Sequence, residues 1–201
     1  MKLKLSFALL PLVLAASAQG TVIISEVFYD TPGNEWEEEW IELYNPSSES
    51  VDIGGYTIRD NVEKWYSLPD TVIRPRGTLV WARDRDGFYD LYSFYPDFGD
   101  LKLSLRNEGD YLILRDPTGV QIDTVAWEGG YKGSHPEWKE IYAEEKSIQR
   151  KSLAQGPNAW LSNRDPNPKD PSPIPEPGTL ILLGSGLAGF AGLIGCRMAR
   201  R

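Results

Sequence analysis

Hydrophobic and polar residues alternate with a period of two in several short segments, and turn residues separate these segments. In the central segment, Glu39–Asp60, Ile41 and Leu43 fall on one face of a predicted strand and Glu42 falls on the other. An Asn-Pro turn and a Gly-Gly turn divide this segment into shorter pieces. The pattern therefore predicts strands joined by tight reversals and gives no helical period here.

The same alternation continues on both sides of the central segment. Further strands are predicted at 21–28, 64–68, 78–82, 101–105, 111–114, 120–126 and 146–150. The stretch Asp84–Asp100 is acidic and aromatic and is broken by glycine and proline, so it is predicted to be a long irregular loop. An Asp-x-x-x-Phe-Tyr motif around Asp84–Tyr92 resembles a helix start, but the loop is preferred. Short strands with regularly spaced turns indicate an all-β sandwich or barrel.

A series of motifs follows a fixed order along residues 21–163. They are Ile-Ser-Glu-Val at 24–27, Glu-Trp-Ile-Glu-Leu-Tyr-Asn-Pro at 39–46, Val-Asp-Ile-Gly-Gly-Tyr-Thr-Ile-Arg-Asp at 51–60, Leu-Ser-Leu-Arg-Asn-Glu-Gly-Asp at 103–110, Ser-Ile-Gln-Arg at 147–150 and Asn-Ala-Trp at 158–160. This series resembles the lamin-tail domain, which we assign to residues 20–163. The resemblance implies an immunoglobulin-like β-sandwich that serves mostly as an interaction module and not as a catalyst.

The N-terminal segment has the features of an export signal. Lys2 and Lys4 flank the start of an apolar run, Leu5–Leu14, and Ala16 and Ala18 form a small-x-small cleavage site. The apolar run is too short to span a bilayer comfortably. We therefore predict a signal peptide at 1–18 that signal peptidase removes after Ala18.

The C-terminal segment has the features of a membrane span. Gly178–Cys196 contains nineteen residues without a charge, which as a helix would measure about 28 Å, close to the hydrocarbon thickness of a bilayer. Arg197, Arg200 and Arg201 follow and act as a stop-transfer cluster, which would keep the C-terminus cytoplasmic and the body outside. We predict one transmembrane helix at 179–196.

A proline-rich linker, predicted at 164–174, precedes this span and is expected to form an extended stalk that does not pack on the body. It leads into the triplet Pro175, Glu176 and Pro177. This triplet, followed by an apolar helix and terminal arginines, resembles the PEP-CTERM sorting signal, which we assign to residues 175–201. The resemblance implies processing by an exosortase, a membrane transpeptidase.

Charge and cysteine content narrow the range of functions. Residues 20–171 hold 16 basic and 28 acidic residues, a net charge of −12. This balance argues against nucleic-acid binding, because no basic stripe is available to neutralise phosphates. Cys196 is the single cysteine and lies outside the body, so the exported domain must be stable without a disulfide.

Carboxylates are the candidates for chemistry in this chain. Glu35, Glu37 and Glu39 are close in sequence and could form a calcium site or a glycosidase pair, although a charge run is more often a solvated loop. Glu42 is expected to be satisfied by the backbone or by an arginine such as Arg59. No catalytic residue is assigned, because the single histidine lies in a loop without a nucleophile elbow. No cofactor is expected apart from calcium.

Four tryptophans are candidate ligand contacts, although each could equally be a core residue: Trp36, Trp65, Trp127 and Trp138. Together these features predict a non-enzymatic protein that passes through an inner-membrane precursor to the cell surface or extracellular matrix. Its expected partners are signal peptidase, an exosortase-type enzyme, the membrane, and exopolysaccharide or a surface protein. The alternatives are a calcium-dependent extracellular hydrolase, a polysaccharide-binding accessory protein and a passive spacer.

Overall fold

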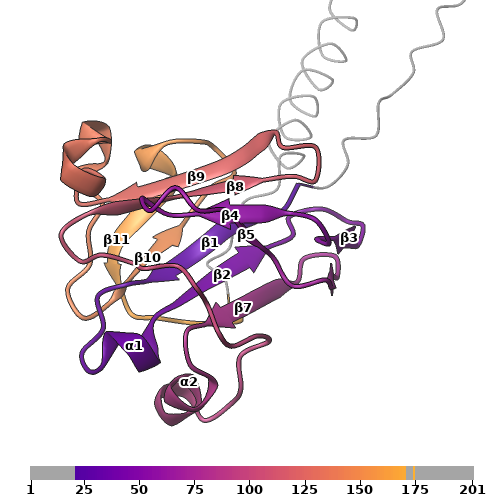
Figure 1. The fold of residues 1–201 in the computed structure, drawn as a ribbon, viewed down its shortest axis with the longest axis horizontal. Coiled ribbons are helices and arrows are strands. Elements are labelled where there is room, and N and C mark those ends of the chain that lie inside the picture. The colour runs from indigo at the N-terminus through magenta and orange to yellow at the C-terminus, as the bar shows by residue number, and fades with distance from the viewer. Residues whose placement is uncertain (1–20, 171–173, 175–201) are drawn as a thin grey trace, which may run out of the picture.

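The computed structural model describes residues 21–170 and residue 174, which fold mostly into β-strands arranged as sandwich-like sheets (Figure 1). The larger sheet is antiparallel and has the order β11-β10-β1-β2-β7. Its strands are β1 (Ile23–Phe28), β2 (Trp40–Tyr44), β7 (Thr78–Ala82), β10 (Ser147–Arg150) and β11 (Trp160–Arg164). The predicted all-β sandwich is confirmed at this level.

The second sheet has four antiparallel strands in the order β5-β4-β8-β9. Its strands are β4 (Thr57–Arg59), β5 (Tyr66–Ser67), β8 (Asp110–Arg115) and β9 (Gln121–Trp127). A two-stranded ribbon of β3 (Val51–Asp52) and β6 (Val72–Ile73) lies at one end. The 3-10 helices are η1 (Tyr131–Gly133), η2 (Pro136–Trp138) and η3 (Pro157–Ala159).

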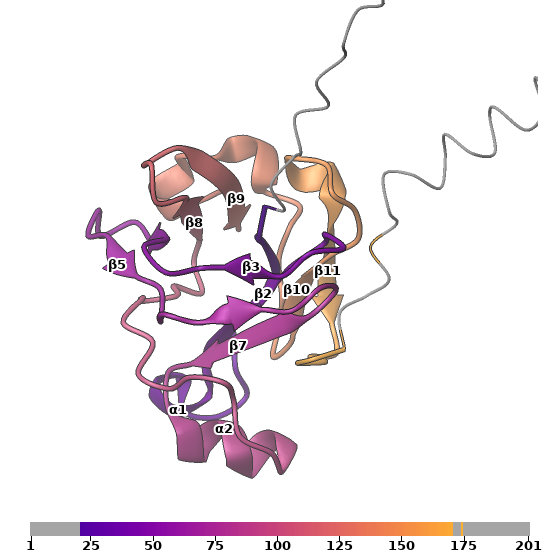
Figure 2. The ribbon, with the colours of Figure 1, turned by 90° about the vertical axis from the view of Figure 1, so that its right-hand side faces the viewer.

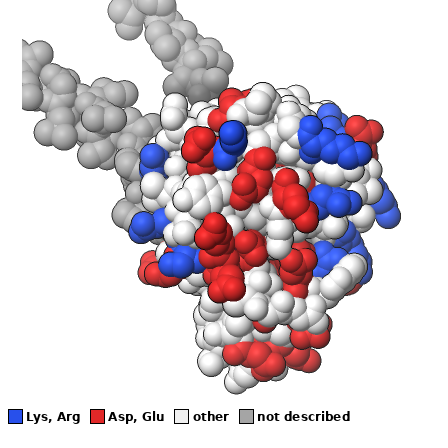
Figure 3. Space-filling model, turned by 90° about the vertical axis from the view of Figure 1, so that its left-hand side faces the viewer, with Lys and Arg blue, Asp and Glu red and all other residues white. Residues whose placement is uncertain are grey.

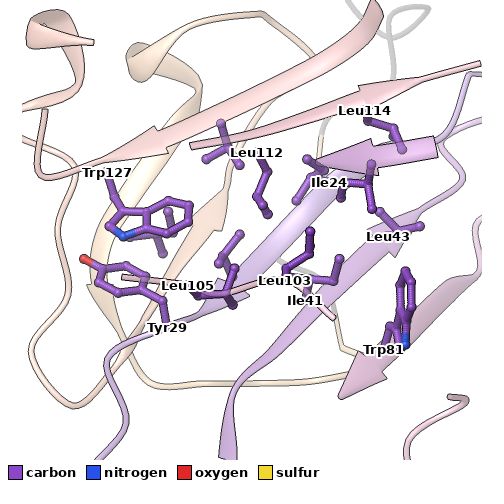
Figure 4. Packing of buried hydrophobic residues seen from close by; sticks show 14 of the residues in the cluster. Ile24, Tyr29, Ile41, Leu43, Trp81, Leu103, Leu105, Leu112, Leu114 and Trp127 are labelled. Atoms are coloured by element: carbon purple, nitrogen blue, oxygen red, sulfur yellow. The ribbon is translucent and has the colours of Figure 1, made fainter. Parts of the chain in front are cut away.

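The main hydrophobic core fills the space between the two sheets (Figure 4). Leu43 from the larger sheet and Leu112 and Leu114 from the smaller one are all buried in this core. Tyr29 stacks on Trp127 with ring centroids 4.8 Å apart. Each large side chain buried in this way contributes roughly 1.5–3 kcal/mol, which allows a domain without a disulfide to be stable.

A buried ion pair also joins the sheets. The Arg150 guanidinium on β10 lies 2.5 Å from Asp123 Oδ1 on β9, and both side chains are fully buried. Asp123 Oδ2 also accepts a hydrogen bond of 2.8 Å from the Ile24 backbone N–H on β1. Asp123 therefore connects the smaller sheet to two strands of the larger one.

Residues 101–105 were predicted to form a strand, and that prediction is wrong. Leu101, Leu103 and Leu105 alternate inward and are 3%, 0% and 2% exposed, but the segment belongs to no sheet. Its backbone groups bond mainly to side chains: the Leu103 carbonyl accepts from Arg83, and the Ser104 N–H donates to a carboxylate. The alternation of leucine with polar residues at 101–105 therefore indicates which side chains are buried, but it does not indicate that the segment pairs with another strand.

Two short α-helices, α1 (Glu35–Glu38) and α2 (Arg85–Tyr92), lie side by side next to the larger sheet (Figure 2). The prediction of an irregular loop at 84–100 missed α2. Asp84 caps this helix by accepting hydrogen bonds from the N–H groups of Asp86 and Gly87. Phe88 on α2 is fully buried against Trp40, in a small cluster that also contains Phe28.

All five residues of β2 are buried, and this cluster covers one of them, Trp40. Trp40 packs against α2, while Ile41 and Leu43 face the main core. The predicted alternation of side chains along the strand is correct, but the second face is also covered and is not open to solvent.

The first part of the predicted stalk packs on the body, contrary to expectation. Pro168 is buried. The backbone N–H of Asn167 donates to Glu26 at 3.2 Å, and that of Lys169 donates to Glu42 at 2.7 Å. Buried carboxyl groups on β1 and β2 thus hold residues 167–169 by their backbone, because these oxygens need hydrogen-bond donors once water is excluded.

The predicted signal peptide and transmembrane helix lie outside the described residues. Within residues 21–170 and residue 174, no helix combines the length and the apolar character that a membrane span needs.

Candidate functional site

A groove beside Trp36 is the candidate site. It lies between α1 and the segment 104–108 and has a volume of about 210 Å³. Its walls include Glu35, Trp36, Glu39, Arg83, Ser104 and Asn107. A second, neighbouring hollow shares Trp36, Arg83 and Ser104 with it, so these three residues stand where the two depressions meet.

Helix α1 presents Trp36 to solvent. Asn34 caps the helix, and its Oδ1 accepts a hydrogen bond of 3.1 Å from the Trp36 backbone N–H. The Trp36 side chain is 72% exposed, which is unusual for so large an apolar group. The Arg83 guanidinium lies 3.9 Å from the centre of the Trp36 ring. One face of the indole is therefore supported by a cation.

Arg83 is itself held in place. It donates to Glu39 Oε2 at 2.8 Å and also to the Leu103 carbonyl oxygen. Glu39 is 3% exposed, and its burial raises the pKa of its carboxyl above the ordinary value, while the nearby guanidinium opposes that rise. A buried carboxylate, a guanidinium and an exposed indole thus form one preorganised unit.

The rim of the groove is acidic. Asn107 Nδ2 donates to Glu35 at 2.6 Å and to Asp30 at 3.3 Å. The pKa of Asp30 is raised, first by burial and then by neighbouring carboxylates that include Glu35 and Glu145. Asp and Glu side chains are prominent over the centre and lower part of this end of the molecule (Figure 3). With Glu39 paired to Arg83, the other charges that line the groove are Glu35, Glu108 and Arg106, a net charge of −1 that disfavours an anionic ligand.

The three glutamates considered as metal ligands point to different partners. Glu39 pairs with Arg83, Glu35 accepts from Asn107, and Glu37 is exposed on α1. Among the described residues, no group of three or more His, Cys, Asp or Glu side chains is arranged to hold a metal ion. Glu42 bonds Ser25 and the Lys169 N–H, whereas Arg59 lies near Glu63 instead.

The four candidate tryptophans separate into two pairs. Trp36 is exposed, and Trp65 is half-buried beside Arg59 and Arg115 of the smaller sheet. Trp127 and Trp138 are 0% and 4% exposed and belong to the core, which is the alternative that the sequence left open. Of the four candidate tryptophans, Trp36 is the one that lines the groove.

The residues assigned to signal cleavage, sorting and stop-transfer lie outside the described part of the chain. They are Ala16, Ala18, Pro175, Glu176, Pro177, Arg197, Arg200 and Arg201.

Sequence reasoning missed Arg83, Ser104 and Asn107 as groove residues. Arg83 directly follows β7 and Asn107 lies in a turn, so neither carries a motif that indicates a site. The tertiary structure brings Arg83 to Trp36 and Asn107 to Glu35, and these residues are too far apart in sequence for a local pattern to predict the contacts.

Comparison with known families supports two of the assignments. The family model for the Lamin Tail Domain matches residues 15–129, and the model for the PEP-CTERM protein-sorting motif matches residues 173–201. A comparison with curated proteins finds no match. The first match covers more than half of the chain and includes the strands that carry the groove. The chain therefore belongs to the lamin tail domain family and carries a C-terminal PEP-CTERM sorting motif.

Proposed function

We propose that this protein is an exported, non-enzymatic protein of the cell surface or extracellular matrix whose immunoglobulin-like sandwich binds a matrix polysaccharide. The PEP-CTERM motif supports export and processing by an exosortase-type enzyme. The lamin tail domain is the exported part of the protein, and we assign the groove beside Trp36 to the polysaccharide ligand.

The observation that carries this proposal is the support of an exposed indole by a fixed guanidinium. Trp36 has one ring face on Arg83 and is otherwise largely open to solvent. A flat, rigid aromatic side chain packs well on the apolar face of a sugar ring. Because both rings are rigid, this stacking costs little conformational entropy. Ser104 lies in the same groove and offers a hydroxyl group to a sugar, whereas the Asn107 amide already donates to Glu35 and Asp30.

The acidic rim favours a neutral sugar over an anionic one in this groove. Glu35 and Glu108 line it, against one arginine outside the Glu39–Arg83 pair, Arg106, and the wider face is rich in carboxylates. Carboxylates accept hydrogen bonds from sugar hydroxyls but repel uronates and sulfates. The engagement of Glu39 by Arg83 supports a binding role over a hydrolytic one, since that carboxylate already has a partner.

Calorimetry with neutral glucans, on the full chain in mild detergent, tests the proposal. The change Trp36→Ala removes the aromatic surface without touching the core, and we expect binding about tenfold weaker. Tyr142→Ala, which removes an aromatic side chain that is 39% exposed elsewhere, is the matched control and should bind like the wild type. Equal binding by the Trp36 variant, or no binding of any neutral glucan by the wild type, would overturn the assignment.

A further inference from the structure

The outer face of the smaller sheet carries a row in which guanidinium groups and aromatic rings alternate. The Arg115 guanidinium lies 3.9 Å from the Trp65 ring centre, and the Arg59 guanidinium lies 5.2 Å from the same ring. Arg59 also lies 5.9 Å from the Tyr111 ring. We call these four residues the arginine–aromatic row.

Strand register places the row on the outer face. In β8, Leu112 and Leu114 are fully buried, so Tyr111 and Arg115 point the other way, where the half-buried Tyr111 ring also contacts the His135 ring at 4.9 Å between centroids. In β4, Ile58 is buried, and Arg59 next to it therefore faces outward. The register between β4 and β8 pairs Arg59 with Ile113 and Thr57 with Arg115, which brings the two arginines to neighbouring positions.

The row is positive within an acidic protein. The acidic residues of the four strands are Asp110 and Asp123, and both are buried, at 0% and 1% exposure. Arg59 and Arg115 are thus the charges that these strands present outward. Arg59 has one long contact, 3.9 Å, with the exposed Glu63. Arg115 has no ion pair within the part of the chain that the structure describes.

The hydrogen-bonding capacity of both guanidinium groups is incompletely used. The Nε–H groups of Arg59 and Arg115 are buried and meet no acceptor among the described residues. Unpartnered buried donors cost free energy, and such groups in a folded protein require an explanation. These buried Nε–H groups are out of reach of a ligand, but stacking occupies only the flat face of a guanidinium and leaves its two Nη groups to pair with a carboxylate.

We propose that the arginine–aromatic row binds an acidic polysaccharide, with carboxylates of successive sugars on Arg59 and Arg115 and sugar rings packed beside Trp65 and Tyr111. Planar guanidinium groups pair with carboxylates through two parallel hydrogen bonds, and aromatic rings pack on the apolar faces of sugars. The surface is separate from the groove beside Trp36, whose rim is acidic. Two faces of opposite character would let one molecule contact two different matrix polymers.

Affinity electrophoresis and calorimetry with alginate, a polymer of uronates, test this inference on the full chain in mild detergent. We expect the double variant Arg59→Gln with Arg115→Gln to bind alginate at least about tenfold more weakly than the wild type at low salt. The matched control is Arg74→Gln, which removes the same charge from an exposed turn away from the row and should bind normally. Binding of neutral dextran, a glucan that we assign to the groove beside Trp36, should be the same in the double variant as in the wild type.

Further variants separate the competing explanations. Because Arg59 is only 19% exposed, the single variant Arg115→Gln and thermal unfolding of each variant guard against misfolding. Equal loss in Arg74→Gln, or wild-type binding by the double variant, would overturn the proposal. So would equally tight binding of polyglutamate or duplex DNA, which would indicate a general preference for polyanions, or concentration-dependent association seen by light scattering without alginate. Trp36→Ala should leave alginate binding unchanged, so this inference and the groove proposal can fail separately.

Discussion

Replacing Asp123 with alanine tests how strongly the buried ion pair holds the two sheets together. The change removes the carboxylate that lies 2.5 Å from Arg150 and accepts the Ile24 N–H at 2.8 Å. Arg150 would keep its hydrogen bonds to the carbonyls of Ile24 and Ala154, both at 2.8 Å. Carbonyl dipoles do not neutralise a full charge, so the guanidinium would stay buried without a counter-ion.

The expected loss follows from that burial. Both side chains are fully buried, and breaking such a pair costs about 3–5 kcal/mol, including the cost of the orphaned donor. A domain of this size has a total stability of about 5–15 kcal/mol. The loss therefore corresponds to a decrease in Tm of roughly 6–20 °C. Asp123→Asn keeps the size and an acceptor for Ile24 and should lose less than the alanine variant.

Urea unfolding followed by tryptophan fluorescence, together with a thermal scan, measures the effect. Asp165→Ala is the control, because Asp165 also pairs with a cation, Lys146 at 2.8 Å, but its side chain is 90% exposed. We expect little change in this control, since solvent screens an exposed pair. A loss below about 1 kcal/mol for Asp123→Ala would refute the reasoning.

Replacing both partners gives a second check. In the double variant Asp123→Leu with Arg150→Met, no charge remains in the interface, so the protein should be more stable than with Asp123→Leu alone. Strict additivity of the two single changes would show that the residues do not act as a pair.

Three further predictions concern other parts of the chain. Burial raises the pKa of Glu26 to about 8 and that of Glu42 to about 7, so the folded state retains protons that the unfolded chain releases above about pH 4.5. Stability should therefore fall as the pH rises from about 5 to 8, and Glu26→Gln should flatten this dependence in thermal scans. Gly87→Ala would place a Cβ 2.3 Å from the Glu37 carbonyl oxygen and should cost about 1–3 kcal/mol in urea unfolding, whereas an unchanged midpoint would mean that α1 and α2 adjust freely. Glu176→Ala, outside the described residues, should leave uncut precursor in membrane fractions, and normal processing of this variant would count against the role of the triplet.

Much of the fold was predictable because strands leave a local signature. The period of two located β1, β2, β7, β8, β9 and β10 to within a few residues, since alternating side chains point to opposite faces of a sheet. The order of motifs also led correctly to the lamin tail domain and the sorting motif. Helix α2 was missed although its cap, Asp84, stands in the sequence, because glycine and aromatic residues hid the helical period.

The candidate site was predictable in part. Trp36 was named from its residue type and its acidic neighbours, but the sequence could not separate it from the buried Trp127 and Trp138. Its support by Arg83 and the pairing of Glu39 depend on strands β2 and β7 lying next to each other, which the local pattern does not specify.

What the sequence by itself determined was the alternation along each strand, the position of the turns and the two family signatures. What only the tertiary structure decided was which faces are covered: α2 on Trp40, residues 167–169 on Glu26 and Glu42, and open solvent over Trp36. The physical reason is that alternation and turns arise from the geometry of neighbouring residues, whereas burial and charge pairing depend on contacts between segments far apart in the chain.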